Sequence, residues 1–242
     1  MTTLGTIQSL DAADALSRLD VASVDLIYVD PPFLTNRDFG AFSDKWDSMD
    51  AYVEFLRQVS TLSRTSMRDT GNFVIHVDPR TSHYVKVMLD SVFGPHHFRN
   101  EVIWNYASGG ASKRHLSKKH DTLLWYTRTD QYKFNVLREP YKTPKVDGRA
   151  GFHPEGRMLT DVWEISFIST TSKERTGYPT QKPLKLIDRV IQVWTDPGDL
   201  VVDPFCGSGT TAAAAAALGR RYAISDIGDE SVAMARERLS DA

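Results

Sequence analysis

Short hydrophobic runs alternate along the chain with segments in which apolar residues recur every three or four positions. Six runs rich in β-branched and aromatic residues end near Asp, Gly or Pro, as buried strands do: 24–29, 72–77, 102–106, 122–127, 200–202 and 221–225. A weaker strand is expected at 6–10. Helical spacing occurs at 49–67, 82–93, 184–194, 210–218 and 230–239. This alternation predicts an α/β fold with a doubly wound, mostly parallel sheet and helices on both faces.

Two stretches, 107–120 and 135–180, fit neither period and are expected to be loops or irregular insertions. The length of 242 residues and a hydrophobic content of 41% favour one α/β domain over the whole chain. The longest apolar stretch, 212–218, is too short to cross a membrane, and the first residues lack the features of a signal peptide. We therefore expect a soluble, cytoplasmic protein with no membrane partner.

The chain contains a single cysteine, Cys206. One cysteine excludes an internal disulfide and a thiolate metal cage, so we expect no metal site.

Charge is distributed unevenly, although the net value is only −2. Residues 97–150 carry 11 Lys and Arg against 5 Asp and Glu, whereas residues 1–60 carry 4 against 10. A cationic middle between acidic ends is compatible with a nucleic-acid partner, and equally with an ordinary solvated surface.

The first motif with chemical content is LVVDPFCGSGTT at residues 200–211, a strand followed by a glycine turn and a helix. Gly207 and Gly209 let the backbone bend and let a ligand approach without a Cβ in the way. The motif lacks the Gly-Lys-Ser/Thr of a phosphate-binding P-loop and the third glycine of the dinucleotide fingerprint. Asp226, which ends the next strand, is placed to accept the hydroxyls of a ribose, so an adenosine-bearing cofactor is expected. The alternative is a plain glycine turn with an Asp that caps the following helix.

The second motif is Asp30-Pro31-Pro32-Phe33, directly after the strand at 24–29. Ligands of open α/β sheets collect at this edge, although Asp-Pro is also common in ordinary strand-ending turns. The prolines have no N–H to donate and hold Asp30 and the Pro31 carbonyl as neighbouring acceptors. Such a pair suits an amino group on an aromatic ring, because accepting hydrogen bonds from its N–H groups frees the nitrogen lone pair. Phe33 is expected to stack on that ring.

Together, DPPF at 30–33, TQKP at 180–183 and DPFCGSGT at 203–210 resemble the S-adenosylmethionine-dependent amino DNA methyltransferases. The catalytic motif precedes the cofactor motif, which is similar to the circularly permuted β class, in which a target-recognition region lies between the two. The resemblance implies a Rossmann-like methyltransferase sheet, with residues 107–177 as a compact recognition region. It also suggests a role in restriction–modification and a homodimer.

The resemblance assigns roles to individual residues. The catalytic set is Asp30, Pro31, Pro32 and Phe33, the last being Tyr more often in the family. The cofactor set is Asp11, Thr180, Lys182, Pro183, Asp203, Phe205, Cys206, Gly207, Ser208, Gly209, Thr210 and Asp226. Within it, Cys206 is expected to be a small wall residue with no catalytic function. Asp11 has an equally good alternative role as a helix cap, and Lys182 as a surface lysine.

The expected target is a base in double-stranded DNA, swung out of the helix so that its amine can reach the cofactor. Phosphate contacts are assigned to Arg37, Lys113, Arg114, His115, Lys118 and Lys119, with Gly109 and Gly110 allowing the segment to move. Salt bridges to Asp38, Asp44 or Asp47 are an equally good alternative for Arg37. Asp before Pro-Pro in this family favours adenine N6, with cytosine N4 as the alternative. Two further alternatives are a non-catalytic DNA-binding subunit of the same fold and an enzyme acting on RNA or a protein amide.

Overall fold

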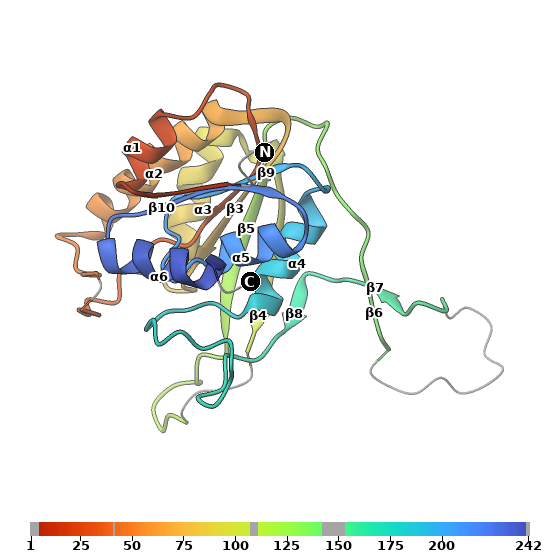
Figure 1. The fold of residues 1–242 in the computed structure, drawn as a ribbon. Helices are drawn as coiled ribbons and strands as arrows, with labels where there is room; N and C mark the ends of the chain where they lie inside the picture. The colour runs from red at the N-terminus through yellow and green to blue at the C-terminus, as the bar shows by residue number, and fades with distance from the viewer. Residues whose placement is uncertain (1–4, 41, 107–110, 142–152, 241–242) are drawn as a thin grey trace.

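The computed structural model describes residues 5–40, 42–106, 111–141 and 153–240. Its main sheet has eight strands in the order β1-β10-β9-β2-β3-β5-β4-β8 (Figure 1). The strands are β1 (Gly5–Ser9), β2 (Val24–Val29), β3 (Met67–Val77), β4 (Phe98–Asn105), β5 (His120–Thr127), β8 (Val162–Glu164), β9 (Leu200–Asp203) and β10 (Arg221–Asp226). The helices are α1 (Ala12–Ser17), α2 (Met49–Ser66), α3 (Ser82–Phe93), α4 (Leu184–Trp194), α5 (Thr210–Ala217) and α6 (Asp229–Ser240), with a 3-10 turn at Pro95–His97.

The sheet is mostly parallel, as the sequence predicts. Neighbours from β1 through β10, β9 and β2 to β3 are all parallel. The exception is β5, which runs antiparallel to both β3 and β4, while β8 is parallel to β4. The antiparallel strand brings the start of β5 to the same sheet edge as the carboxyl end of β3.

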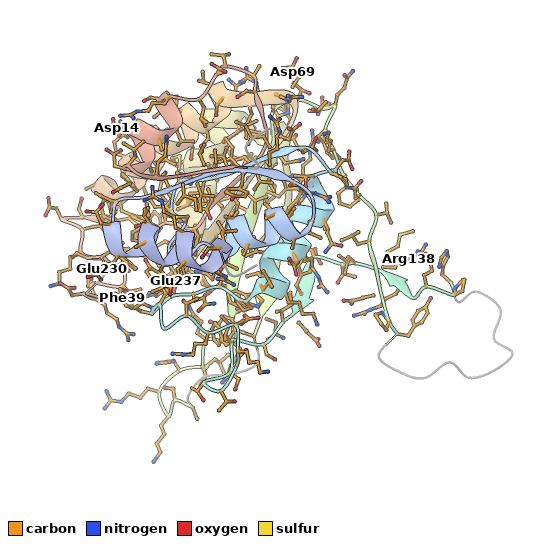
Figure 2. The ribbon with its side chains drawn as sticks, in the orientation of Figure 1. Asp14, Phe39, Asp69, Arg138, Glu230 and Glu237 are labelled. Atoms are coloured by element: carbon orange, nitrogen blue, oxygen red, sulfur yellow. The ribbon has the colours of Figure 1, made fainter. Side chains whose placement is uncertain are left out.

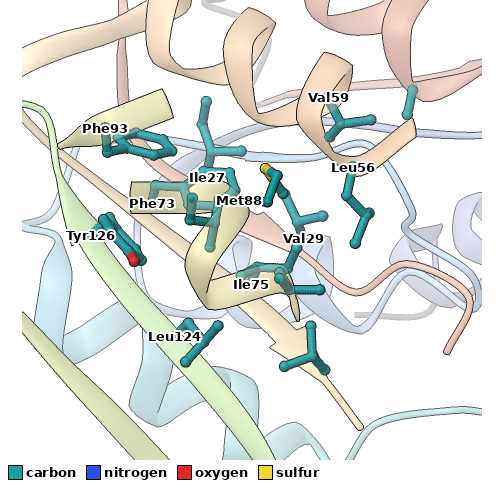
Figure 3. Packing of buried hydrophobic residues seen from close by; sticks show 14 of the residues in the cluster. Ile27, Val29, Leu56, Val59, Phe73, Ile75, Met88, Phe93, Leu124 and Tyr126 are labelled. Atoms are coloured by element: carbon teal, nitrogen blue, oxygen red, sulfur yellow. The ribbon is translucent and has the colours of Figure 1, made fainter. Parts of the chain in front are cut away.

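Helices cover both faces of the sheet, α1 to α3 on one and α4 to α6 on the other (Figure 1). Alternate residues of β2 explain why: Ile27 and Val29 pack in the cluster with α2 and α3, whereas Leu26 and Tyr28 pack in the cluster with α4. Figure 3 shows the first cluster, where Leu56 and Val59 of α2 lie over the strands. A strand buried on both faces reads as a continuous hydrophobic run, as residues 24–29 do.

The expectation that 135–180 lacks regular structure is wrong in part. Within its described residues, β6 (Arg138–Glu139) pairs with β7 (Arg157–Met158), and β8 extends the main sheet beside β4. Strands of two or three residues are too short to show an alternating pattern, which is why the sequence does not reveal them. Arg138 lies on this β6–β7 arm (Figure 2), and the neighbouring Glu139 lies 3.4 Å from Arg189 of α4.

The described residues contain no helix that is long and apolar enough to cross a membrane. The same ranges hold no group of three or more His, Cys, Asp or Glu side chains arranged to bind a metal ion.

Candidate active site

The two motifs that lie far apart in the sequence meet because their strands are neighbours. β2 pairs in parallel with β9, with Leu26 opposite Val201 and Ile27 opposite Val202. Since parallel strands end at the same edge, Asp30 after β2 lies beside the loop that follows Asp203. On the far side of β9, Ser9 of β1 pairs with Asp226 of β10. The ends of four strands therefore surround one space.

That space is a cavity of about 390 Å³. It is lined by all four residues of the predicted catalytic set, Asp30, Pro31, Pro32 and Phe33. It is also lined by ten of the predicted cofactor set: Asp11, Thr180, Lys182, Asp203, Phe205, Cys206, Gly207, Ser208, Thr210 and Asp226. Pro183 and Gly209 do not line it, since Pro183 is the N-cap of α4 and Gly209 faces α6.

The two glycines of the turn before α5, Gly207 and Gly209, are needed for different structural reasons. Gly207 has φ +47° and donates its N–H to Asp226 Oδ2 at 2.9 Å. Gly209 has φ +74°, and a Cβ there would lie 2.6 Å from the Cβ of Ala235 in α6. The expectation that Gly209 leaves room for a ligand is therefore corrected: its missing side chain makes room for a helix.

Two acidic side chains occupy one end of the cavity. Asp226 accepts one backbone N–H on each oxygen, from Gly207 and from Gly228 at 2.9 Å, which leaves each oxygen a further lone pair. Asp11 caps α1 through Oδ1, which accepts the N–H groups of Ala13 and Asp14. The alternative role of Asp11 as a cap is thus realised, and the same residue lines the cavity.

Asp203 lies at the floor of the site and is 2% exposed. Its carboxyl accepts the Thr211 hydroxyl at 2.5 Å and the Phe205 N–H at 2.9 Å. Burial, reinforced by the charges of Asp30 and Asp226, raises the pKa of Asp203 to about 7. The thiol of Cys206 is also buried, and burial followed by the charge of Asp203 raises its pKa far above the usual range, so it stays protonated.

Asp30 is bound to Lys182, whose Nζ donates to Asp30 Oδ2 and lies 5.0 Å from the centre of the Phe33 ring. Lys182 is therefore neither a solvated surface lysine nor free to face a cofactor carboxylate in this state of the site. The other oxygen, Oδ1, is buried and accepts no hydrogen bond from the residues that the structure describes. An amino group with two N–H bonds would find an unused acceptor here.

Behind Asp30 lies a histidine that sequence reasoning missed. His76 of β3 is fully buried, with Nδ1 3.5 Å from Asp30 Oδ1 and Nε2 3.4 Å from Asp121 Oδ2. The available signal was a single imidazole within the hydrophobic run 72–77. A buried histidine between two carboxylates is electrostatically linked to both.

The segment after Phe33 is folded around Asp44, which the sequence suggested only as a salt-bridge partner. Asp44 is 1% exposed and accepts the N–H groups of Leu34 and Thr35, both at 2.8 Å, and the Thr35 hydroxyl at 2.6 Å. The segment brings the stacked rings of Phe39 and Phe42 to the wall of the cavity. The wall beside these rings is therefore apolar.

A second cavity of about 290 Å³ adjoins the first. The residues common to both linings are Phe33, Tyr178, Thr180, Gln181 and Lys182. The second cavity also touches Trp104, Asp121, Phe167 and Arg175. Phe33 thus lies between the first cavity, which is lined by the glycine turn before α5, and the second cavity, which is lined by Trp104 and Phe167.

The predicted phosphate-binding residues divide into two groups. Arg37, Lys113, Arg114 and His115 are exposed, and Leu116 beside them is 97% exposed. Lys118 is bound to Asp78 Oδ2 at 2.6 Å and to Asp121 Oδ1 at 2.8 Å, and Lys119 is partly buried. Gly109 and Gly110 lie outside the described residues.

Comparison with known proteins gives a consistent result. The profile of the family described as DNA methylase matches residues 24–237. Type II methyltransferase M.HpaI of Haemophilus parainfluenzae is 31% identical over 229 residues, which cover 95% of this chain and 72% of the relative. The DNA adenine methyltransferase YhdJ of Escherichia coli is 28% identical over 96% of this chain and 81% of its own length.

Solved structures share the fold. The PvuII DNA methyltransferase, described as cytosine-N4-specific, has a TM-score of 0.77 at 19% identity and covers 99% of this chain and 87% of its own. The M1.HpyAVI complex has a TM-score of 0.68 at 24% identity and covers 97% and 98%. At these identities the likeness concerns the fold, and the Rossmann-like methyltransferase sheet is confirmed.

Proposed function

This chain belongs to the DNA methylase family, and on that premise we propose that it methylates the N6 amine of adenine in double-stranded DNA. It is an S-adenosyl-L-methionine-dependent DNA methyltransferase, similar to Type II methyltransferases of restriction–modification systems. The choice of adenine and the roles of individual residues are the proposal.

One observation supports the proposal most directly: Asp30 lines the first cavity, and its motif partner Phe33 lines both cavities. The cavity bounded by the glycine turn suits the cofactor, and the adjoining aromatic cavity suits an everted base. Asp30 Oδ1 has no hydrogen-bond donor among the described residues, so it is available to the N–H of a target amine. Phe33 lines both cavities and offers a face for stacking.

The residues of the first cavity fit the cofactor. Asp226 keeps lone pairs for two ribose hydroxyls, and Gly207 donates its N–H to that carboxylate, whereas a Cβ at Gly207 would lie 2.8 Å from the ring of Tyr178. Asp11 would meet the adenine edge, and Thr180 and Thr210 would lie towards the methionine part, with Pro183 and Gly209 shaping the wall from behind. When bound, the cofactor supplies an electrophilic methyl group. The protein contributes positioning and electrostatics.

In the proposed reaction the target amine enters from the second cavity and donates an N–H to Asp30 Oδ1. Pro31 and Pro32 hold this acceptor rigidly because their backbone dihedrals are restricted. Lys182 balances the charge of Asp30 until the amine arrives, and its Nζ lies 5.0 Å from the centre of the Phe33 ring. The acceptor is therefore preorganised for an amine.

Adenine is favoured over cytosine by Asp30 before Pro-Pro and by similarity to YhdJ, which is described as a DNA adenine methyltransferase. The cytosine-N4-specific relative with the same fold makes N4 of cytosine the alternative product. Both targets are amines conjugated to a ring, so the geometry of Asp30 suits either.

Further parts of the proposal concern the DNA. We assign residues 107–177 to target recognition, with Lys113, Arg114 and His115 contacting phosphates and Arg37 approaching from the segment after Phe33. We assign the chain to the circularly permuted β class, because Asp30 precedes the cofactor loop in sequence while β1 lies beside β10 in the sheet. A homodimer would double the cationic surface.

The test uses purified protein, genomic DNA from a host without DNA methylases and the cofactor. Digestion to nucleosides and mass analysis should give N6-methyladenine. Asp30→Ala should bind the cofactor in calorimetry and yield no methylated nucleoside. A product of N4-methylcytosine would overturn the choice of adenine, and full turnover by Asp30→Ala would overturn the catalytic assignment. Failure of the wild-type protein to bind the cofactor would point to a non-catalytic subunit.

A further inference from the structure

The first cavity is lined mainly by acidic groups where it is charged at all. Its described lining contains five aspartates and one basic residue: Asp11, Asp30, Asp44, Asp203, Asp226 and Lys182. Lys182 is bound to Asp30, so its charge is already used. S-adenosyl-L-methionine carries a positive sulfonium, a positive ammonium and a negative carboxylate. The acidic lining suits the two positive groups, whereas the carboxylate needs a positive charge from elsewhere.

A positive charge lies directly behind the glycine turn. Arg238 of α6 donates from Nη1 to the Thr210 hydroxyl at 2.9 Å and to the Ser208 carbonyl at 3.5 Å. Thr210 and Ser208 line the first cavity, and Arg238 lies one layer behind them. The packing of α6 explains this position, because Ala235 faces Gly209 and Arg238 is three residues further along the same helix face.

The charge of Arg238 is only partly compensated. Both of its hydrogen bonds go to neutral oxygens. Burial lowers the pKa of Arg238, and the charge of Glu174 offsets part of this effect. The guanidinium stays protonated all the same, because the ordinary pKa of arginine is above about 12. A half-buried cation whose hydrogen bonds go to neutral partners is stabilised when an anion comes near.

The directions of the hydrogen bonds leave Thr210 with a hydrogen to donate. A guanidinium only donates, so Thr210 Oγ1 is the acceptor in its bond with Arg238. The acceptors in reach of the Thr210 hydroxyl hydrogen are the Lys182 carbonyl at 3.4 Å and the Ser208 hydroxyl at 3.5 Å. Both distances are well above the usual O–H···O distance of about 2.7–2.8 Å. Since a hydroxyl rotates, an anion in the cavity would take this hydrogen.

From these contacts we propose that Arg238 holds the carboxylate of S-adenosyl-L-methionine in place through the Thr210 hydroxyl. The inference rests on the proposed function, in which Thr210 lies towards the methionine part of the cofactor. Arg238 is a positioning residue: it contacts Thr210, and Thr210 contacts the carboxylate. The charged donor polarises the Thr210 hydroxyl, so the bond from Thr210 to the carboxylate is strengthened.

The same arrangement distinguishes the two charged ends of the amino acid. The ammonium could also approach the oxygen of Thr210, but the positive charge of Arg238 behind that oxygen would repel it. The carboxylate is attracted by the same charge. Arg238 therefore fixes which way round the methionine part lies, although it does not line the cavity.

The experiment is calorimetric titration of the full chain with two ligands that differ only in the carboxylate, S-adenosyl-L-methionine and decarboxylated S-adenosylmethionine. Arg238→Met should bind S-adenosyl-L-methionine about tenfold more weakly than wild type. It should bind the decarboxylated ligand within about twofold of wild type, because that ligand has no carboxylate to lose its partner. Arg238→Lys should recover part of the loss, since an ammonium keeps the charge and a donor.

The matched control is Arg236→Met, which removes an equal charge from the same helix. Arg236 is exposed and donates to the Ile7 carbonyl at 2.9 Å, so this variant should bind both ligands as wild type does. Thr210→Val tests the route. It should show the same selective loss as Arg238→Met, and the double variant should lose little more than either single one, because the two residues act in series.

Wild-type affinity of Arg238→Met for S-adenosyl-L-methionine would overturn the inference. Equal weakening of both ligands would also overturn it, because a merely structural role distorts the turn for either ligand. So would fully additive losses in the double variant. If Arg238→Met does not fold, Arg238→Lys and Thr210→Val decide by the same comparison of ligands. The proposed function fails separately, when wild type yields no N6-methyladenine; methylation by wild type beside unchanged binding by Arg238→Met sinks only the inference.

Discussion

Gly209→Ala is a sharp test of how the glycine turn at 206–209, the proposed cofactor loop, is built. The backbone at Gly209 has φ +74°, a left-handed conformation that L side chains rarely adopt. The Cβ of an alanine there would lie 2.6 Å from the Cβ and 2.9 Å from the Cα of Ala235. The second atom belongs to the backbone of α6, so a change of rotamer cannot relieve the contact.

The magnitude follows from these two costs. A left-handed alanine costs about 1–2 kcal/mol, and an added methyl in a closely packed contact costs about 1–3 kcal/mol. Together they amount to about 2–5 kcal/mol, a large share of the roughly 5–15 kcal/mol that stabilises a typical domain. For a chain of this size each kcal/mol lowers the melting temperature by about 2–4 °C, so Gly209→Ala should melt about 4–20 °C below wild type.

The matched control is Gly219→Ala. Gly219 has φ +71° with no atom within 4 Å of the added Cβ, so it carries the backbone strain without the clash. Thermal unfolding of wild type and both variants, followed by circular dichroism, should place Gly219→Ala between the other two. Calorimetric titration with S-adenosyl-L-methionine should show weaker binding only for Gly209→Ala, because a displaced α6 moves the start of α5. Equal melting temperatures for the two variants would refute the reasoning that contact with α6 is what requires Gly209.

Three further outcomes are expected. The pKa of Asp203 is raised to about 7, so the folded protein keeps a proton that the unfolded chain has released. Between about pH 4 and pH 7 the free energy of unfolding of wild type should therefore fall with rising pH, relative to that of Asp203→Asn. Parallel curves of unfolding free energy against pH, from denaturant titrations of the two proteins, would contradict this. The double variant Lys113→Ala, Arg114→Ala should bind DNA more weakly, and its slope of log affinity against log salt should be smaller by about 2. Arg57→Ala on α2 is the control. If the double variant has the wild-type slope, neither residue contacts phosphate. Asn72→Ala should lower the free energy of unfolding by about 2–4 kcal/mol, because Asn72 accepts the Trp125 indole N–H at 2.8 Å and donates to the carbonyls of Lys133 and Trp194. The control is Asn100→Ala, a change at an exposed asparagine. Urea titration measures the unfolding free energy of both variants, and equal losses would contradict the role of Asn72.

The sequence predicted the parts of the fold whose pattern is local. The strand at 24–29 and the helices at 82–93 and 184–194 have the predicted bounds, because their apolar periodicity begins and ends with the element. The helix at 12–17 was anticipated only through Asp11 as its cap, since six residues are too few to show a helical period. The direction of β5 could not be predicted, because strand order and orientation depend on contacts far apart in the chain.

The candidate site divides in the same way. Asp30, Gly207 and Asp226 stand in motifs that can be read from neighbouring letters, and the structure brings all three to one cavity. His76 and Asp121 have no such motif. Each is a single polar residue at a strand end, and its partners come from other strands. Only the sheet reveals that the two side chains face each other at 3.4 Å.

The order of the strands gives the site its chemical order. β9 brings the cofactor loop, and its neighbour β2 brings Asp30; β3 follows with His76 and then β5 with Asp121. The first three strands are parallel, so their carboxyl ends meet at one edge of the sheet. If β5 were also parallel, its last residue, Thr127, would lie at that edge. Because β5 is antiparallel, with Thr122 opposite Val77, its beginning reaches that edge, and Asp121 lies beside Asp78 within reach of Lys118. The reversal of one strand thus places a buried carboxylate behind His76 and connects it, through Lys118, to the segment that carries Lys113 and Arg114. Lys118 therefore joins the two buried carboxylates of Asp78 and Asp121 to the segment that we propose contacts DNA.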